Sequence, residues 1–188
     1  MGRDSLARLQ RNPVVAAVSD LSRLGAVIRS PSEVVFLLRG SILTLPEAVQ
    51  EVQAAGKAVF LHLDLIEGFS RDSVALEYIK QEIRPEGVIT TRANLVKQAA
   101  AAGLEAVQRV FMLDSLSLET AIKSLKATRP HAVELLPGIV PRVVERVGRE
   151  TRLPVIAGGL IESKEDVIAA LKAGALGIST TKEDLWYI

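Results

Sequence analysis

Short apolar runs rich in Val, Ile, Leu and Ala recur along the chain, and they begin roughly 20 residues apart. Aliphatic runs without regular polar alternation are typical of parallel strands that are buried on both faces. The pattern predicts eight strands, at Val14–Val18, Val34–Leu38, Ala58–Leu65, Gly87–Thr90, Ala106–Leu113, Ala132–Leu136, Pro154–Ala157 and Ala175–Ile178.

Segments with the helical spacing of apolar residues lie between most of these runs. Ser117 and Ser163 are expected N-caps, and Gly56, Gly103 and Gly174 stand where helices should end. The clear helical segments are Leu45–Ala55, Asp72–Glu82, Ala93–Ala102, Ser117–Ala127, Val140–Glu150 and Lys164–Ala173.

Strands and helices that alternate along a chain form a parallel sheet, and eight repeats favour closure of that sheet. Such barrels usually have about 200 residues or more, so a chain of 188 residues requires very short loops. We therefore predict an α/β fold, a compact TIM-type (β/α)8 barrel over residues 14–188, with an open doubly wound sheet as the alternative. Residues 1–13 are expected to form a helical extension across the N-terminal end of the barrel.

Composition narrows the class of protein. The chain is 48% hydrophobic but only 4% aromatic, so the core must be aliphatic. The absence of Cys excludes disulfides and thiolate metal sites and agrees with a cytoplasmic location. The N-terminal residues do not resemble a signal peptide, and no apolar run approaches the roughly 20 residues that span a bilayer. A net charge of +1 lacks the basic excess of an obligate nucleic-acid binder, although it allows a local basic patch.

The last two predicted strands end in residues with small side chains. Gly158 and Gly159 close the seventh strand, and Ser179, Thr180 and Thr181 close the eighth. Adjacent strand ends of this kind gather backbone N–H groups and hydroxyls, as in the phosphate sites of (β/α)8 barrels. We predict that Gly158, Gly159, Ser179 and Thr180 bind the phosphate of a small phosphorylated molecule.

Polar side chains interrupt the third strand near its C-terminal end. Alternation points Leu61, Leu63 and Leu65 toward the helices and turns His62 and Asp64 into the barrel. Ligands of such barrels bind at the C-terminal ends of the strands, so His62 and Asp64 are predicted ligand contacts. The alternative is that Asp64 caps the following loop and that His62 is a hydrogen-bonded core residue.

Charged residues also lie within the fifth and sixth strands. Arg109 and Glu134 should be neighbours, either as a buried ion pair or as contacts to a polar ligand. Asp114 after the fifth strand and Thr90 at the end of the fourth complete the predicted polar contacts. No Lys lies within a strand near its C-terminal end, which disfavours Schiff-base chemistry. We predict no catalytic residue, no cofactor and no metal site.

Arg142, Arg146 and Arg149 recur at helical spacing, so they share one face of the helix predicted at Val140–Glu150. This face is either a solvated surface balanced by Glu145 and Glu150 or a contact surface for RNA phosphates. The pattern alone leaves both interpretations open.

Taken together, these segments resemble the family of glycerol-3-phosphate-responsive antiterminators, which regulate glycerol uptake operons. The likeness covers nearly the whole chain, and its specificity lies in the combination and order of the segments. Differences from the family pattern occur at Ser41, Thr90 and Arg92. The segments that carry the resemblance are Val59–Gly68, Gly87–Thr91, Gln108–Ser115, Val133–Gly138, Ile156–Ile161 and Ser179–Trp186.

The resemblance implies a barrel without known catalysis that binds glycerol 3-phosphate and then acts on the leader mRNA of glycerol genes. Gly158, Gly159, Ser179 and Thr180 would hold the phosphate, and Asp64 with Glu134 or Asp114 would accept hydrogen bonds from the glycerol hydroxyls.

Two other functions remain open from the residues. A phosphate-binding barrel enzyme, such as an isomerase, epimerase or synthase, could use Asp64 and Asp114 as an acid/base pair. A structural or assembly subunit could associate through the Leu- and Ala-rich helices, and a homo-oligomer is compatible with either function.

Overall fold

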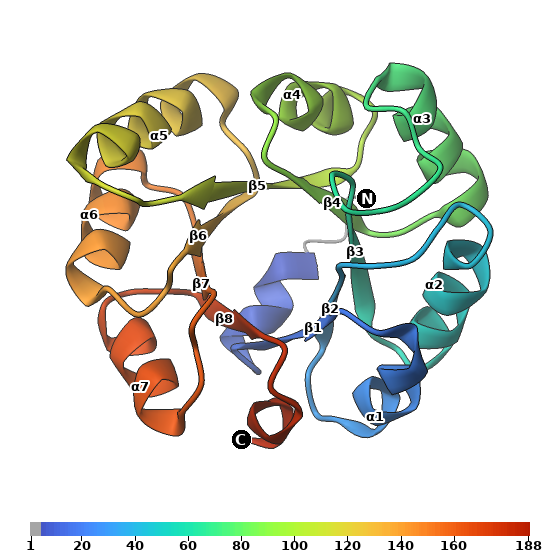
Figure 1. Ribbon diagram of the computed structural model, residues 1–188, viewed down its shortest axis with the longest axis horizontal. Helices are drawn as coiled ribbons and strands as arrows, with labels where there is room; N and C mark the ends of the chain where they lie inside the picture. The colour runs from blue at the N-terminus through green and yellow to red at the C-terminus, as the bar shows by residue number, and fades with distance from the viewer. Residues whose placement is uncertain (1–4) are drawn as a thin grey trace.

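The computed structural model describes residues 5–188, which form a closed barrel of eight parallel strands in sequence order (Figure 1). The barrel closes where β8 pairs with β1, with Val14 opposite Ile178 and Val15 opposite Ser179. The predicted (β/α)8 barrel is therefore confirmed, and the alternative prediction of an open doubly wound sheet is wrong. The strands are β1 Val14–Val18, β2 Val34–Leu37, β3 Ala58–His62, β4 Gly87–Thr90, β5 Glu105–Phe111, β6 Ala132–Leu136, β7 Val155–Gly158 and β8 Gly177–Thr180.

Helices surround the barrel and cover the outer face of every strand (Figure 1). The α-helices are α1 Leu24–Arg29, α2 Leu45–Ala54, α3 Ser73–Tyr78, α4 Ala93–Ala101, α5 Ser115–Thr128, α6 Pro141–Thr151 and α7 Lys164–Lys172. The π-helical segment η3 Ile79–Ile83 extends α3, and the 3₁₀ helices are η1 Ser5–Gln10, η2 Leu21–Arg23 and η4 Glu183–Tyr187. None of the helices in residues 5–188 is long and apolar enough to cross a membrane.

Side-chain alternation along the strands divides the core into two apolar clusters. Outward residues such as Val133 and Leu135 pack against the helices, whereas inward residues such as Ala132 and Ile156 fill the barrel. This division follows from the two-residue period of a strand. Because both faces of each strand are buried, most strands contain few polar residues.

The 3₁₀ helix η1 closes the N-terminal end of the barrel and crosses the centre of the strand ring in Figure 1. Its Leu6 and Leu9 are buried in the inward cluster with Phe36 and Phe60. The predicted extension at residues 1–13 thus includes a short helix at residues 5–10, and residues 1–4 lie outside the described part of the chain.

Helix ends follow the sequence signals with one exception. Ser163 caps α7, while Gly56, Gly103 and Gly174 follow α2, α4 and α7 with φ of +79°, +82° and +92°. The prediction that Ser117 is an N-cap is wrong, because α5 begins three residues earlier, at an Asp cap.

The C-terminal ends of five strands also differ from the sequence pattern. β2, β3 and β5 end one, three and two residues earlier than predicted, β7 ends one residue later, and β8 is shifted two residues toward the C-terminus. Leu61 and Leu63 join the outward cluster as expected. The expectation that Leu65 packs toward the helices is wrong, because it lies in the turn after β3 and is 38% exposed.

Replacing Leu9→Ala should lower the free energy of unfolding by about 2–5 kcal/mol, because it leaves a cavity where η1 packs into the barrel. Leu9 is 1% exposed, whereas Leu43 is 86% exposed and provides the control. Leu43→Ala should change stability by less than about 0.5 kcal/mol. Urea unfolding checks both variants, and equal effects would show that η1 does not stabilise the barrel.

Candidate functional site

A pocket of about 230 Å³ opens at the C-terminal end of the barrel, beside the ends of β7 and β8. Arg109 and Glu134 line its inner part, and Gly159, Thr181 and Lys182 are among the residues around them. The pocket lies where the sequence predicts a phosphate site, and two cationic side chains reach it.

The turn after β7 supplies unpaired backbone donors to this pocket. Gly159 and Leu160 both have positive φ, of 71° and 59°, and this conformation is uncommon for a non-glycine residue. Within residues 5–188, the N–H groups of Leu160 and Thr181 donate to no other group. Leu160 and Thr181 both line the pocket, and free N–H groups at neighbouring strand ends are donors of the kind that bind phosphate.

Gly158 makes space for polar side chains rather than lining the pocket. A Cβ atom there would lie 2.3 Å from Ser179 Oγ and 3.0 Å from Glu134 Oε1. Ser179 Oγ in turn donates a 2.6 Å hydrogen bond to Glu134 Oε1. Any larger residue at position 158 would displace one of these groups.

Arg109 and Glu134 form an ion pair inside the barrel. They are directly opposite in the register of β5 and β6, with Arg109 Nε 2.6 Å from Glu134 Oε2. Their side chains are only 10% and 2% exposed, so each charge needs the other. Of the two interpretations that the sequence left open, the ion pair is therefore the one that the structure shows. Both carboxylate oxygens of Glu134 are already hydrogen-bonded, whereas Arg109 has further N–H groups at the pocket.

His62 is buried at the same end of the barrel. It is 2% exposed, and neither ring nitrogen has a hydrogen-bond partner within residues 5–188. Burial, followed by the positive charge of Arg109, lowers the pKa of His62 to about 4 against the opposing effect of Asp64. At neutral pH the ring is uncharged, with one donor and one acceptor, which matches the hydrogen bonding of a hydroxyl.

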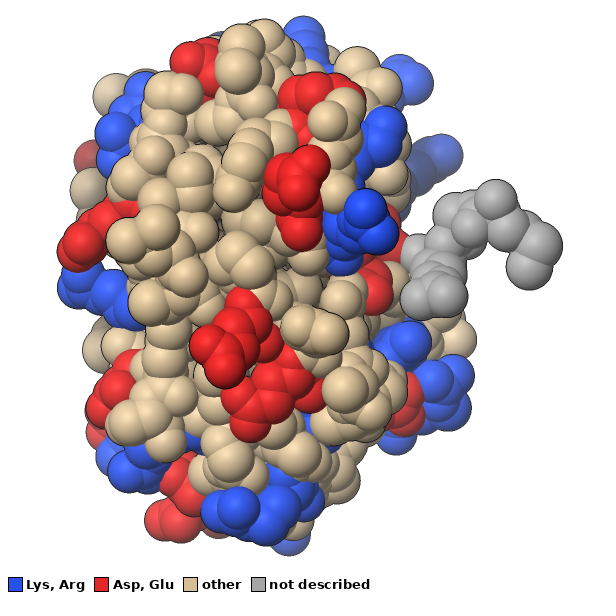
Figure 2. Space-filling model, turned by 90° about the vertical axis from the view of Figure 1, so that its right-hand side faces the viewer, with Lys and Arg blue, Asp and Glu red and all other residues tan. Residues whose placement is uncertain are grey.

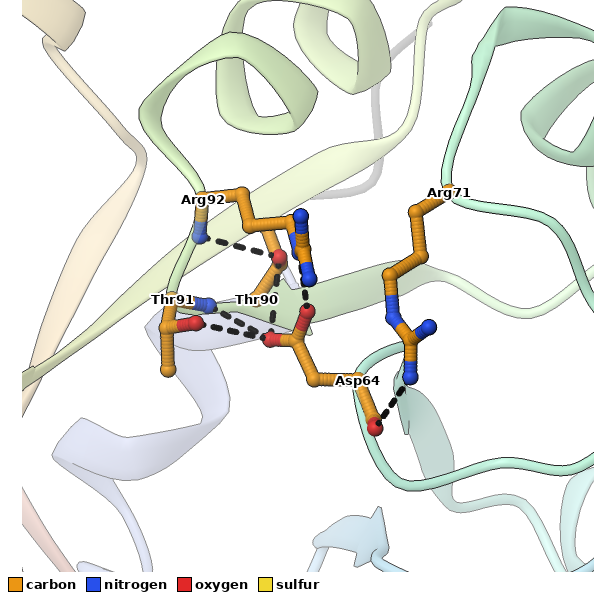
Figure 3. Close-up of polar contacts among 5 residues, drawn as sticks. All are labelled: Asp64, Arg71, Thr90, Thr91 and Arg92. Atoms are coloured by element: carbon orange, nitrogen blue, oxygen red, sulfur yellow. Dashed lines mark hydrogen bonds and ion pairs between the residues drawn. The ribbon is translucent and has the colours of Figure 1, made fainter.

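Asp64 connects two loops at the rim of the barrel (Figure 3). Its carboxylate accepts hydrogen bonds from the Thr90 hydroxyl, from the N–H and hydroxyl of Thr91, and from Arg92 Nε. Arg71 donates to its backbone carbonyl. Burial alone would raise the pKa of Asp64, but the hydrogen bonds from Thr91 and Thr90 hold it below its usual value. In this geometry Asp64 and Thr90 bind each other and fix the loop after β4.

Two other predicted contacts are used locally. The Thr180 hydroxyl donates to the carbonyl of Ile161 at 3.1 Å, so this side chain braces the turn after β7. Asp114 is the N-cap of α5 and accepts from Ser117 N at 2.7 Å. Asp114 lines a different depression, between α5 and α6, and the structure does not bring it to the pocket.

The arginines of α6 lie on one face, as the helical spacing predicts. Arg146 pairs with Glu150 at 2.7 Å and Arg149 approaches Glu145 at 3.6 Å. These two ion pairs agree with the interpretation of this face as a solvated surface whose charge Glu145 and Glu150 balance. All three arginines also line the depression between α5 and α6.

Leu160 and Lys182 belong to the pocket but were not found from the sequence. Lys182 directly follows Ser179, Thr180 and Thr181, so its place next to the predicted phosphate site could have identified it from the sequence. The role of Leu160 depends on its backbone conformation, which an ordinary Leu in a Gly-Gly-Leu sequence does not indicate.

Comparison with known proteins assigns the family. The family model described as the glycerol-3-phosphate responsive antiterminator matches residues 14–186. The chain belongs to this family. It is a family of regulatory antiterminators rather than of enzymes, although enzymes share its fold.

Relatives of similar length support this assignment. The glycerol uptake operon antiterminator regulatory protein of Listeria monocytogenes is 32% identical, with a TM-score of 0.89 over 93% of this chain and 95% of that one. An antiterminator-related protein of Thermotoga maritima is also 32% identical, with a TM-score of 0.83 over 92% and 96%. The uncharacterised protein YgcP of Escherichia coli is 37% identical over 178 residues, which are 95% of this chain and 93% of the relative.

Similarity to enzymes is limited to the fold. N-acetylmannosamine-6-phosphate 2-epimerase from Clostridium perfringens is 15% identical, with a TM-score of 0.67 over 93% of this chain and 88% of that one. This antiterminator family therefore uses a barrel architecture that is also found in phosphosugar enzymes.

The buried His62 should make the stability of this antiterminator family member depend on pH. Its pKa is lowered from 6.5 to about 4, so below pH 6.5 the unfolded state binds a proton that the folded state excludes. Stability is complete above pH 6.5 and is lost as the pH falls toward 4, by roughly 3 kcal/mol in total.

The measurement compares urea unfolding of the wild type and His62→Gln between pH 7.5 and 4.5. Gln keeps a donor and an acceptor but does not titrate, so the difference between the two curves should shrink as the pH falls. Above pH 7 the two curves should run parallel, and a constant difference over the whole range would contradict the buried neutral imidazole.

Proposed function

We propose that the protein binds glycerol 3-phosphate in the pocket beside β7 and β8 and, when loaded, acts on the leader mRNA of glycerol genes as a transcription antiterminator. The observation that carries this proposal is the set of free donors at the pocket in a chain of the glycerol-3-phosphate responsive family. An antiterminator acts on nascent transcripts, so the proposal places the protein in the cytoplasm.

The phosphate would bind between the two strand ends. The N–H groups of Leu160 and Thr181 and the side chains of Lys182 and Arg109 supply donors and positive charge. Gly159 suits this wall because its φ of +71° favours glycine and because a Cβ atom there would lie 3.1 Å from the Leu136 side chain, which would have to shift. Compared with the sequence prediction, backbone donors take over the role assigned to the Thr180 hydroxyl.

The glycerol end would extend toward the buried polar groups of the barrel. His62 has two unpaired nitrogens, and Arg109 has N–H groups that Glu134 does not use. A hydroxyl can donate to one ring nitrogen or accept from the other. Leaving such groups unpaired costs free energy, so a polyol that satisfies them is favoured over a simple phosphate.

Sensing requires that glycerol 3-phosphate bind the RNA-competent conformation more tightly than the other conformation. A tenfold effect on RNA affinity corresponds to about 1.4 kcal/mol. One or two hydrogen bonds made in only one of the two conformations supply a free energy of this size.

Glycerol 3-phosphate should raise the melting temperature, whereas glycerol at the same concentration should not, because the phosphate supplies the charge that the strand ends recognise. Differential scanning fluorimetry measures both, and Lys182→Ala should reduce the shift caused by glycerol 3-phosphate. An equal shift with the two compounds would rule out the phosphate site.

The regulatory activity predicts ligand-dependent RNA binding. A titration of the leader RNA of a glycerol gene should show at least tenfold tighter binding at saturating glycerol 3-phosphate. A scrambled RNA of the same length and composition provides the control. Binding that is unaffected by glycerol 3-phosphate, or equal for both RNAs, would contradict the proposed function.

A further inference from the structure

A groove of about 680 Å³ lies beside the phosphate pocket at the same end of the barrel, between α5 and α6. Its floor is apolar and includes Met112, Leu118 and Val143. One wall is basic and consists of Arg142, Arg146 and Arg149 of α6. The groove thus joins an apolar floor to a row of guanidinium groups about 10 Å long.

The segment that forms this groove concentrates the positive charge of the chain. Residues 112–152 contain seven Lys and Arg against five Asp and Glu, while the whole chain has 23 basic and 22 acidic residues. The rest of the chain is therefore slightly acidic. On the opposite side of the barrel, around α2 and α3, acidic and basic side chains are mixed without a continuous basic area (Figure 2). This asymmetry favours an anionic partner at the groove.

The three arginines are free to bind such a partner. No ion pair forms at Arg142 within the described chain, and the pairs of Arg146 and Arg149 are solvent-exposed. Exposed pairs contribute little stability, so phosphates can replace their carboxylates. Of the acidic groups in the groove, Asp114 is bound to the N-terminus of α5 and Glu145 is the partner of Arg149.

The rim of the groove offers surfaces on which bases can stack. Leu113 is 84% exposed, and on the adjoining surface Phe111 is 51% exposed. Single-stranded RNA is bound by cationic grooves in combination with exposed aromatic and apolar side chains. A duplex would offer only its backbone to such a surface, so a single strand fits this combination better.

One short loop separates the groove from the phosphate pocket. Gly138 N–H donates to the carbonyls of Gly158 at 2.6 Å and Gly159 at 3.2 Å. Leu136 and Gly159 line the pocket, whereas Pro137 and Val140 line the groove. The turn after β7 is therefore hydrogen-bonded to the loop that forms part of the groove wall.

We propose that the groove between α5 and α6 holds a single-stranded segment of the regulated RNA, and that the loop at residues 136–140 couples it to the ligand pocket. This inference rests on the proposed function and adds the surface and the route of regulation. Phosphates bind Arg142, Arg146 and Arg149, while bases lie against the apolar floor and rim.

The double variant Arg142→Ala/Arg149→Ala tests the surface. Leader RNA binding at saturating glycerol 3-phosphate should weaken at least tenfold, and the slope of log K against log salt should fall by about 1.4, or about 0.7 for each phosphate contact. The melting-temperature shift caused by glycerol 3-phosphate should remain. The matched control is Lys97→Ala/Lys172→Ala, which removes two exposed charges from α4 and α7 and should leave the slope unchanged.

The outcomes separate this inference from the proposed function. If the wild type binds leader RNA in a ligand-dependent manner and the arginine variant binds it equally well, the inference that the groove binds RNA is wrong, but the proposed function is supported. A wild type that binds no leader RNA at any ligand concentration overturns both. If sedimentation shows that the arginine variant changes oligomeric state with unchanged RNA affinity, the groove binds a second copy of the chain instead.

Hydrogen exchange of the wild-type protein tests the coupling. Glycerol 3-phosphate should slow exchange not only around Gly159 but also in residues 136–143, because Gly138 N–H is bonded to the turn that closes on the ligand. Peptides from α3 should be unaffected. Protection confined to the ends of β7 and β8 would overturn the proposed route.

Discussion

The carboxylate of Glu134 is buried inside an aliphatic barrel. The polar side chains at this end of the interior are placed so that they compensate its charge and bind both of its oxygens. Arg109 supplies the opposite charge from β5, and Ser179 supplies a hydroxyl from β8. Removing Arg109 would leave a buried charge uncompensated, which is strongly destabilising, whereas removing the Ser179 hydroxyl would leave one carboxylate oxygen without its hydrogen bond. Gly158 is required for the same reason, because a side chain there would occupy the space of Ser179 and Glu134. Four strands are thereby held in fixed relation beneath the pocket.

This arrangement separates structural polar groups from those available to a ligand. Glu134 has used both oxygens, and Asp64 holds the loop after β4. The groups not used in this way include the remaining N–H groups of Arg109 and the free backbone N–H groups beside β7 and β8, which lie at the pocket, and the two nitrogens of His62, which are buried and do not line it. Two carboxylates line the pocket: Glu134 is paired with Arg109, and the exposed Glu162 forms no ion pair within residues 5–188. With Glu134 already paired, a pocket rich in donors suits the binding of a phosphorylated polyol better than acid/base catalysis.

The sequence predicted the barrel because periodic aliphatic runs and helix-end glycines are local signals that tertiary contacts do not override. The pairing of Arg109 with Glu134 was also predictable, since buried charges on neighbouring strands must compensate each other. The uses of Asp64 and Asp114 were not, because a carboxylate after a strand can bind a ligand, a loop or a helix N-terminus equally well. The helical spacing predicted that Arg142, Arg146 and Arg149 share one face of a helix. Only the fold shows that this face lines a groove next to the loop at residues 136–140, which contacts the turn after β7.

The free energies involved are compatible with regulation through that loop. A neutral hydrogen bond contributes about 0.5–1.5 kcal/mol, and a tenfold change in affinity requires about 1.4 kcal/mol. The bifurcated hydrogen bond from Gly138 N–H to the carbonyls of Gly158 and Gly159 is therefore comparable in free energy to the tenfold effect that the proposed regulation requires. If the groove binds RNA as we propose, linkage requires that RNA tighten the binding of the ligand by the same factor. In this proposal the rigid interior around Glu134 stays fixed, and the loop at residues 136–140 is the element that connects the ligand pocket to the groove.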